Sequence, residues 1–247
     1  MEGDLTQIKA KNYSGLDKYL SISDANIKDN RGRQTSLFEP NFDTYKKPTN
    51  FSVNTRKVQS NNKFDFGQKV KFTIPRYGDK ICEMYLEIEL PTLSNVGYVN
   101  TIGYSLIEYI EVEIGGKTID KHYDTWMDIH DKLMIKADHR EGINEMVLRF
   151  DSHTDSSFRG GTVIVPLKFW FTEGLSQSFP LTSLSHQDII IYVKLRPFKN
   201  VWMSNSGVSP VGTYEITSGY LLVDYIRLDS LERKMMYNKK YKYLIKQ

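Results

Sequence analysis

The sequence predicts an all-β fold with short helices in the loops, and three observations carry this prediction. Apolar residues alternate with polar ones in several short runs, which is typical of strands with one buried face. Aromatic residues are abundant, with 16 Tyr and 12 Phe in 247 residues, and they favour strands over helices. About eight strands are joined by connections of very unequal length, which fits a Greek-key or jelly-roll sandwich better than an up-and-down barrel.

The first strands follow residue 50. Alternation predicts one strand over 51–55 and another over 69–74, which Pro75 ends. The clearest run covers 82–90, where one face carries Cys82, Met84, Leu86, Ile88 and Leu90 and the other carries glutamates and Tyr85. A slip of one residue would bury three glutamates, so the pairing register of this strand is firmly set.

The central stretch from Tyr104 to Met134 changes its period partway. Ile110, Val112 and Ile114 alternate with glutamates, and Gly115-Gly116 supplies the two residues that a tight hairpin turn requires. After the return strand, helical spacing places Trp126, Ile129, His130, Leu133 and Met134 on one side, with Thr125 and Asp128 as a capping box. We therefore expect strand, hairpin and amphipathic helix to pack as one unit.

The remainder alternates between long loops and strands. Residues 136–161 are polar and predict a surface excursion with one short strand near 146–150. Further strands are predicted over 162–171, 188–196 and 214–228, a short helix over 229–237, and an extended piece over 241–245. The excursion and the loop at 201–212 are the expected surfaces for contact with neighbouring molecules.

Composition excludes several classes of protein. The net charge of +3 gives no argument for nucleic-acid binding. Cys82 is the only cysteine, so no internal disulfide can form, and its place in a strand predicts a small core residue. No apolar run reaches the roughly 20 residues that a membrane-spanning helix needs, and the first residues lack a signal-peptide pattern. We expect a protein made and used in the cytosol.

No motif for catalysis, metal or cofactor binding emerges. Gly115-Gly116-Lys117-Thr118 resembles the end of a phosphate-binding loop, but Glu111 stands where that motif needs glycine. The five histidines lack zinc-site spacing. Asp151, His153 and Asp155 would share a strand face and could hold a surface ion, but a solvated loop is the favoured interpretation. Basic and aromatic residues near the C-terminus could bind nucleic acid, but such residues more often form a solvated helix end and an amphipathic strand.

The central stretch carries a family resemblance. Residues 108–133, EYIEVEIGGKTIDKHYDTWMDIHDKL, resemble the signature of major capsid proteins of the nucleocytoplasmic large DNA viruses, through the structural motif of Gly115, Gly116, His122, Tyr123 and Trp126. Other segments are similar in order and type. They are Thr49-Asn50-Phe51, Phe66-Gly67, Ile74 to Asp79, Met84 to Leu86, Glu89 to Pro91, Pro180 to Leu184, Ile189 to Val193, Leu228-Asp229, Glu232-Arg233 and Tyr243 to Ile245.

The resemblance implies an eight-stranded antiparallel jelly roll, the first of two in tandem, with three copies forming a pseudo-hexagonal capsomer of an icosahedral shell. It divides the chain into an N-terminal arm at 1–46, a jelly-roll domain at 47–228, and a helix and linker at 229–247 that lead toward a second jelly roll. It implies a non-enzymatic protein of the virion capsid, assembled in the host cytoplasm. Its partners would be two further copies, other capsid proteins and an inner membrane-associated layer, with no cofactor, no small-molecule substrate and no direct nucleic-acid contact.

Two alternatives remain open at this point. One is a minor capsid or penton-like protein with a single jelly roll, which would assemble as a pentamer. The other is a carbohydrate-binding module or a cupin-like enzyme on a jelly-roll scaffold, because a fold alone does not fix a function.

Overall fold

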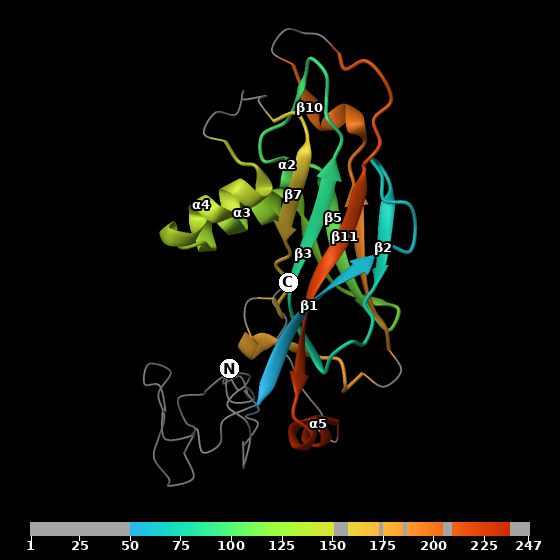
Figure 1. Ribbon diagram of the computed structural model, residues 1–247, viewed down its shortest axis with the longest axis vertical. Helices are drawn as coiled ribbons and strands as arrows, with labels where there is room; N and C mark the ends of the chain where they lie inside the picture. Colours follow the sequence, from blue (N-terminus) through green and yellow to red (C-terminus); the bar gives the residue numbers. More distant parts are fainter. Residues whose placement is uncertain (1–49, 151–157, 173–174, 185–186, 205–208, 238–247) are drawn as a thin grey trace, which may run out of the picture.

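The computed structural model describes residues 50–150, 158–172, 175–184, 187–204 and 209–237. These residues form two antiparallel sheets around a hydrophobic core, with short helices at the margins (Figure 1). The predicted arm at 1–46, the extended piece at 241–245 and the Asp151–His153–Asp155 group lie outside the described residues.

The larger sheet has five strands in the order β1-β11-β3-β7, with β8 also paired to β3. Its strands are β1 (Phe51–Gln59), β11 (Ser218–Leu228), β3 (Lys80–Leu90), β7 (Gly161–Pro166) and β8 (Phe179–Pro180). The second sheet has the order β2-β9-β5-β6. Its strands are β2 (Lys69–Thr73), β9 (Ile189–Leu195), β5 (Ile107–Ile114) and β6 (Lys117–Tyr123).

The remaining elements are short. β4 (Gly97–Tyr98) pairs with β10 (Trp202–Met203) in a separate two-stranded sheet. The helices are α2 (Ile102–Ser105), α3 (Asp124–Met134), α4 (Ala137–Val147) and α5 (Ser230–Tyr237), with 3₁₀ turns η2 (Leu175–Gln177) and η3 (Phe198–Asn200). The described residues thus form eleven strands where the sequence predicts about eight, and three of them, β4, β8 and β10, span only two residues each.

The long strands form nested antiparallel pairs. β5 pairs with β6 at the centre, β3 with β7 outside them, β2 with β9 next, and β1 with β11 outermost. The chain therefore behaves as one long hairpin that is wrapped into two sheets. Its tip is the turn at Gly115-Gly116, so the stretch that opens with β5 lies at the topological centre of the fold.

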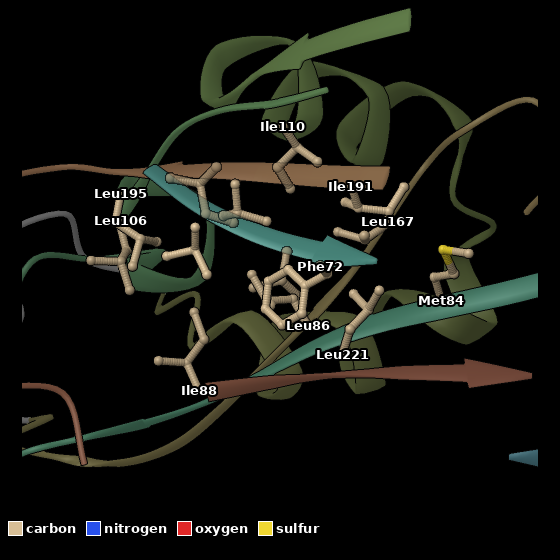
Figure 2. Close-up of a cluster of buried hydrophobic side chains, with 14 of the residues drawn as sticks. Phe72, Met84, Leu86, Ile88, Leu106, Ile110, Leu167, Ile191, Leu195 and Leu221 are labelled. Atoms are coloured by element: carbon tan, nitrogen blue, oxygen red, sulfur yellow. The ribbon is translucent and has the colours of Figure 1, made fainter. Parts of the chain in front are cut away.

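The core lies between the two sheets. Figure 2 shows Leu86, Ile88 and Leu221 from the larger sheet facing Phe72 and Ile191 from the other. The inward face predicted for β3 is confirmed at Leu86 and Ile88, which are fully buried. Each such side chain contributes about 1.5–3 kcal/mol of transfer free energy before the entropic cost of ordering is subtracted.

A β-bulge changes the role of Cys82. The pairing of β3 with β11 shifts between Val223 and Tyr225, so β3 carries one extra residue there. The shift turns Ile81 into the main core, whereas Cys82 packs in a second small cluster with Ile226, Leu228 and Met236 of α5. The predicted burial of Cys82 is confirmed, but its predicted place on the same face as Met84 is wrong.

Two strand boundaries also differ from the prediction. β7 ends at Pro166 instead of reaching Phe171, because proline cannot donate to the strand ladder. Phe169 and Phe171 are nevertheless buried. β11 begins at Ser218 instead of Tyr214, because Tyr214 leaves the sheet and stacks on Phe198 with ring centroids 5.0 Å apart.

The predicted polar excursion at 136–161 is wrong over its first part, which forms α4, and no strand forms at 146–150. Ile143 and Val147 are four residues apart, which is a helical spacing, and Val147 is fully buried. In the sequence, the charged residues around Ile143 and Val147 obscure this short apolar pattern. α2 approaches closely here, because a Cβ at Gly103 would lie only 3.0 Å from Val147 Cα.

Candidate interaction surface around the hairpin and helix α3

The hairpin between β5 and β6 turns on two glycines in the left-handed region. Gly115 has φ +59° and Gly116 has φ +82°, and Ile114 pairs with Lys117 across the turn. This two-residue turn is the predicted one, and it favours glycine at both positions. A Cβ at Gly115 would lie 2.9 Å from Cδ of Gln187, an exposed side chain that can move aside, whereas Gly116 faces open space.

Behind the hairpin, His122 lies between two aromatic rings. Its imidazole stacks on Trp126 at a centroid distance of 4.0 Å and on Phe169 at 5.1 Å. His122 Nε2 lies 3.1 Å from Oδ2 of the buried Asp120. The stack continues to His130, which is half-buried beside Trp126. The motif residues His122 and Trp126 thus join β6 to α3, while Tyr123 is half-exposed at the start of the helix.

The acidic side of α3 faces the protein. Asp124 accepts a hydrogen bond of 2.7 Å from Arg196 Nη2, and Asp128 accepts one of 2.7 Å from Arg149 Nη2. Asp131 is buried, accepts a hydrogen bond from the Tyr104 hydroxyl, and lies 3.7 Å from Lys168 Nζ. Met127, also buried, completes this side. Three polar links from different parts of the chain therefore fix the rotation of the helix.

These contacts shift two pKa values. Partial burial opposes ionisation of Asp128, but the hydrogen bond from Lys132 and the charge of Arg149 together hold its pKa below the usual range. Burial raises the pKa of Tyr104, and the neighbouring carboxylate of Asp131 raises it further. Tyr104 therefore stays protonated and donates to Asp131.

The opposite side of α3 is apolar and exposed. Trp126 is 40% exposed, Ile129 50%, Leu133 76% and Met134 67%. The predicted periodicity is confirmed, but the apolar side of the helix faces away from the core, because the acidic side holds the buried contacts. The predicted capping box is also wrong: α3 begins at Asp124, and no side chain caps it.

A second feature joins two segments that carry the family resemblance, the one that ends at Asp79 and the one that contains Arg233. Asp79 accepts two hydrogen bonds from Arg233 of α5, of 2.7 Å from Nε and 3.0 Å from Nη2. It also accepts one of 2.8 Å from the backbone N–H of Leu228. Arg76, Arg227 and Thr182 line an open cleft of about 480 Å³ beside this pair. The Asp79–Arg233 ion pair holds α5 against the small hydrophobic cluster that contains Cys82.

Burial raises the pKa of the Cys82 thiol to about 11, so this cysteine is a packing residue and a poor nucleophile. Within the described ranges, no group of three or more His, Cys, Asp or Glu side chains could hold a metal ion. None of the helices in the described part of the chain has the length and apolar character to cross a membrane.

Together, these features define an antiparallel β-sandwich. Its most notable surface feature is the exposed apolar side of α3. The family model described as the N-terminus of the major capsid protein matches residues 37–229. The chain belongs to this family.

Individual relatives agree. The major capsid protein of Pyramimonas orientalis virus is 32% identical over all of this chain and 58% of its own length. The major capsid protein of Paramecium bursaria Chlorella virus 1 is 29% identical over all of this chain and 53% of its own length. The chain thus spans little more than half the length of these relatives.

Solved structures agree in fold. The crystal structure of PBCV-1 VP54, fitted into a reconstruction of the virophage Sputnik, matches with a TM-score of 0.69 and 28% identity, over 85% of this chain and 49% of that one. The Faustovirus major capsid protein matches with a TM-score of 0.68 over 81% of this chain and 58% of that one. At 12% identity, the second match concerns the fold alone.

Several features were missed from the sequence. The polar contacts of Asp124, Asp128 and Asp131 join residues far apart in the chain, so no local sequence pattern predicts them. The Asp79–Arg233 pair had a signal, because both residues lie in segments that carry the family resemblance, but nothing in those segments indicates that they meet.

Proposed function

We propose that this chain is a structural building block of a viral capsid shell that associates with copies of itself as a trimeric capsomer and with other capsid proteins. One observation supports the proposal: the nested strand pairs, from the β5–β6 hairpin out to β1–β11, follow the wrapped-hairpin order expected of a jelly roll. The same arrangement is matched by a solved capsid protein at 28% identity.

The proposal assigns the chain to the virion shell, with synthesis and assembly in the host cytoplasm. Residues 47–228 form one jelly roll, and residues 229–247 lead toward a second one, in keeping with relatives about twice as long. The chain acts through contacts and catalyses no reaction. It takes no cofactor and no small-molecule substrate, and it touches no nucleic acid directly. An inner membrane-associated layer is a further neighbour.

The symmetry of the purified assembly tests this proposal. The 247-residue chain would be expressed alone, its mass measured by light scattering, and its particles classified by negative-stain electron microscopy. Three copies with threefold symmetry are expected. Fivefold assemblies would favour a penton-like protein instead. A monomer that binds defined sugars on a glycan array would replace the proposal with a carbohydrate-binding module.

A further inference from the structure

Three arginines from separate segments line one open cleft beside the end of β11, where α5 begins (Figure 1). Arg76 lies in the loop between β2 and β3, Arg227 near the end of β11, and Arg233 in α5. Together with Asp79 and Thr182, among others, they line a volume of about 480 Å³, which is called the arginine cleft below. This volume lies within the range of about 300–1,000 Å³ that is typical of sites for small ligands.

The carboxylate of Asp79 holds Arg233 in place. Asp79 is 5% exposed and accepts two hydrogen bonds from Arg233 and one from the backbone N–H of Leu228. Asp229, which precedes α5, also attracts Arg233 but does not line the cleft. Arg233 is therefore committed to carboxylates of its own chain, and its main role is to position α5.

The other two arginines are oriented by backbone carbonyls. Arg227 Nε lies 3.4 Å from the carbonyl oxygen of Tyr77, and Arg76 Nη2 donates to the carbonyl oxygen of Gln187 at 3.0 Å. A carbonyl group orients a guanidinium but carries no net charge. The residues that line the cleft thus carry three positive charges and one negative charge, an excess of two. Arginine stays protonated at any physiological pH, so this excess is permanent.

The walls of the cleft are fixed by backbone contacts. The N–H of Asp79 donates to the carbonyl oxygen of Ile226 at 2.8 Å, and the N–H of Leu181 donates to that of Asp79 at 2.9 Å. Gly78 lies directly against β11, because a Cβ there would be only 2.8 Å from Cβ of Tyr225. An anion would therefore enter a site that already has its shape, which keeps the entropic cost of binding low.

The chemistry of the lining favours a phosphate group over a carboxylate. A guanidinium group donates a fork of hydrogen bonds that fits either anion. A carboxylate has two oxygens in one plane, and one guanidinium can satisfy it, as Arg233 does for Asp79. A phosphate group presents oxygens in several directions, so it can accept from two guanidinium groups that come from different segments. Arg76 and Arg227 form such a pair.

We propose that the arginine cleft binds a phosphate group, with Arg76 and Arg227 as its donors. The phosphate comes from a soluble phosphate compound or from the headgroup of an anionic lipid, which share the chemistry that these arginines recognise. The inference goes beyond the proposed function and does not depend on it. A lipid source would add a contact between this chain and a membrane-associated layer.

Paired glutamine substitutions test the site. Isothermal titration calorimetry with inorganic phosphate at low ionic strength, where exposed charges are least screened, would compare the 247-residue wild type with the double variant Arg76→Gln, Arg227→Gln. The matched control is Arg140→Gln, Arg159→Gln, because both residues are exposed, lie outside the cleft and carry the same charge. We expect the double variant to bind phosphate about tenfold more weakly or less, through the loss of charge-assisted hydrogen bonds. The control should bind like the wild type, and circular dichroism should show all three folded.

Two further probes identify the ligand class and its source. Acetate, titrated in the same way, should bind more weakly than phosphate, and equal affinity would overturn the assignment to phosphate. Vesicles of phosphatidylcholine with and without phosphatidic acid would be sedimented with the wild type and the double variant. Sedimentation that requires both phosphatidic acid and the two arginines supports a lipid source. Binding of inorganic phosphate without such sedimentation supports a soluble source.

The proposal is overturned if the wild type binds neither inorganic phosphate nor the phosphatidic acid vesicles, or if the double variant binds as tightly as the wild type. If the double variant does not fold, ¹⁵N NMR of the wild type decides, with signals assigned through Arg76→Lys and Arg227→Lys. Phosphate should shift the Nε–H signals of Arg76 and Arg227, and shifts confined to other arginines would refute the site. Threefold assemblies would support the proposed function in each of these cases, so the two proposals fail separately.

Discussion

The hydrogen bond from Tyr104 to Asp131 offers a clean test of how α3 is held. Tyr104 is 2% exposed and Asp131 is 1% exposed, and the bond joins helix α2 to helix α3. Tyr104→Phe removes one hydroxyl and creates no cavity. It leaves a buried carboxylate without its donor, with Lys168 Nζ at 3.7 Å as the remaining partner. Hydrogen bonds to charged groups contribute about 1.5–3 kcal/mol, so we expect a loss of about 2 kcal/mol.

Thermal unfolding followed by circular dichroism would measure this loss. For a chain of this size, about 2 kcal/mol lowers the melting temperature by about 4–8 °C. The matched control is Tyr237→Phe, because Tyr237 is 67% exposed and its ring lies at the end of α5. The control should melt like the wild type. An unchanged melting temperature for Tyr104→Phe would refute the claim that buried polar contacts fix the rotation of α3.

Three further predictions follow from the same contacts. Ionised Asp128 stabilises the fold at pH values above its unfolded-state pKa of about 4, and this stabilisation is lost as the pH falls below that value. The difference in unfolding free energy between wild type and Asp128→Asn, measured by urea titration, should therefore shrink from pH 6 to pH 3. A constant difference would contradict this prediction. With a pKa of about 11, Cys82 is about 0.1% thiolate at pH 8. A disulfide reagent should therefore react with Cys82 only after denaturation. Rapid reaction with the native chain would contradict the burial of this thiol. Gly116→Ala and Gly115→Ala should each cost about 1–2 kcal/mol of unfolding free energy, because both positions have a positive φ. Urea denaturation would measure the loss, and full stability in either variant would be inconsistent with the turn.

Much of the fold was predictable because it follows from local patterns. Alternation along β3 places Leu86 and Ile88 in the core, and two adjacent glycines predict the hairpin at Gly115-Gly116. The predictions were wrong where contacts between distant parts of the chain determine the local structure. The bulge that moves Cys82 into its own cluster depends on the register of β11, which lies about 140 residues later in the chain.

The orientation of α3 shows why the interaction surface was not predictable. Periodicity identifies an apolar side and an acidic side of the helix, and the usual expectation buries the apolar one. The side that is buried depends on Arg149, Arg196 and Tyr104, which come from three other segments and supply partners for the acidic side. Sequence periodicity reports that two faces exist, whereas the distant partners determine which of them is covered.

The location of this chain in assembled particles tests the central claim most directly. Electron cryomicroscopy of virions that carry the protein should place the two sheets in the shell, in capsomers with threefold symmetry. A shell whose density cannot accommodate β1 to β11, or capsomers without threefold symmetry, would contradict the account.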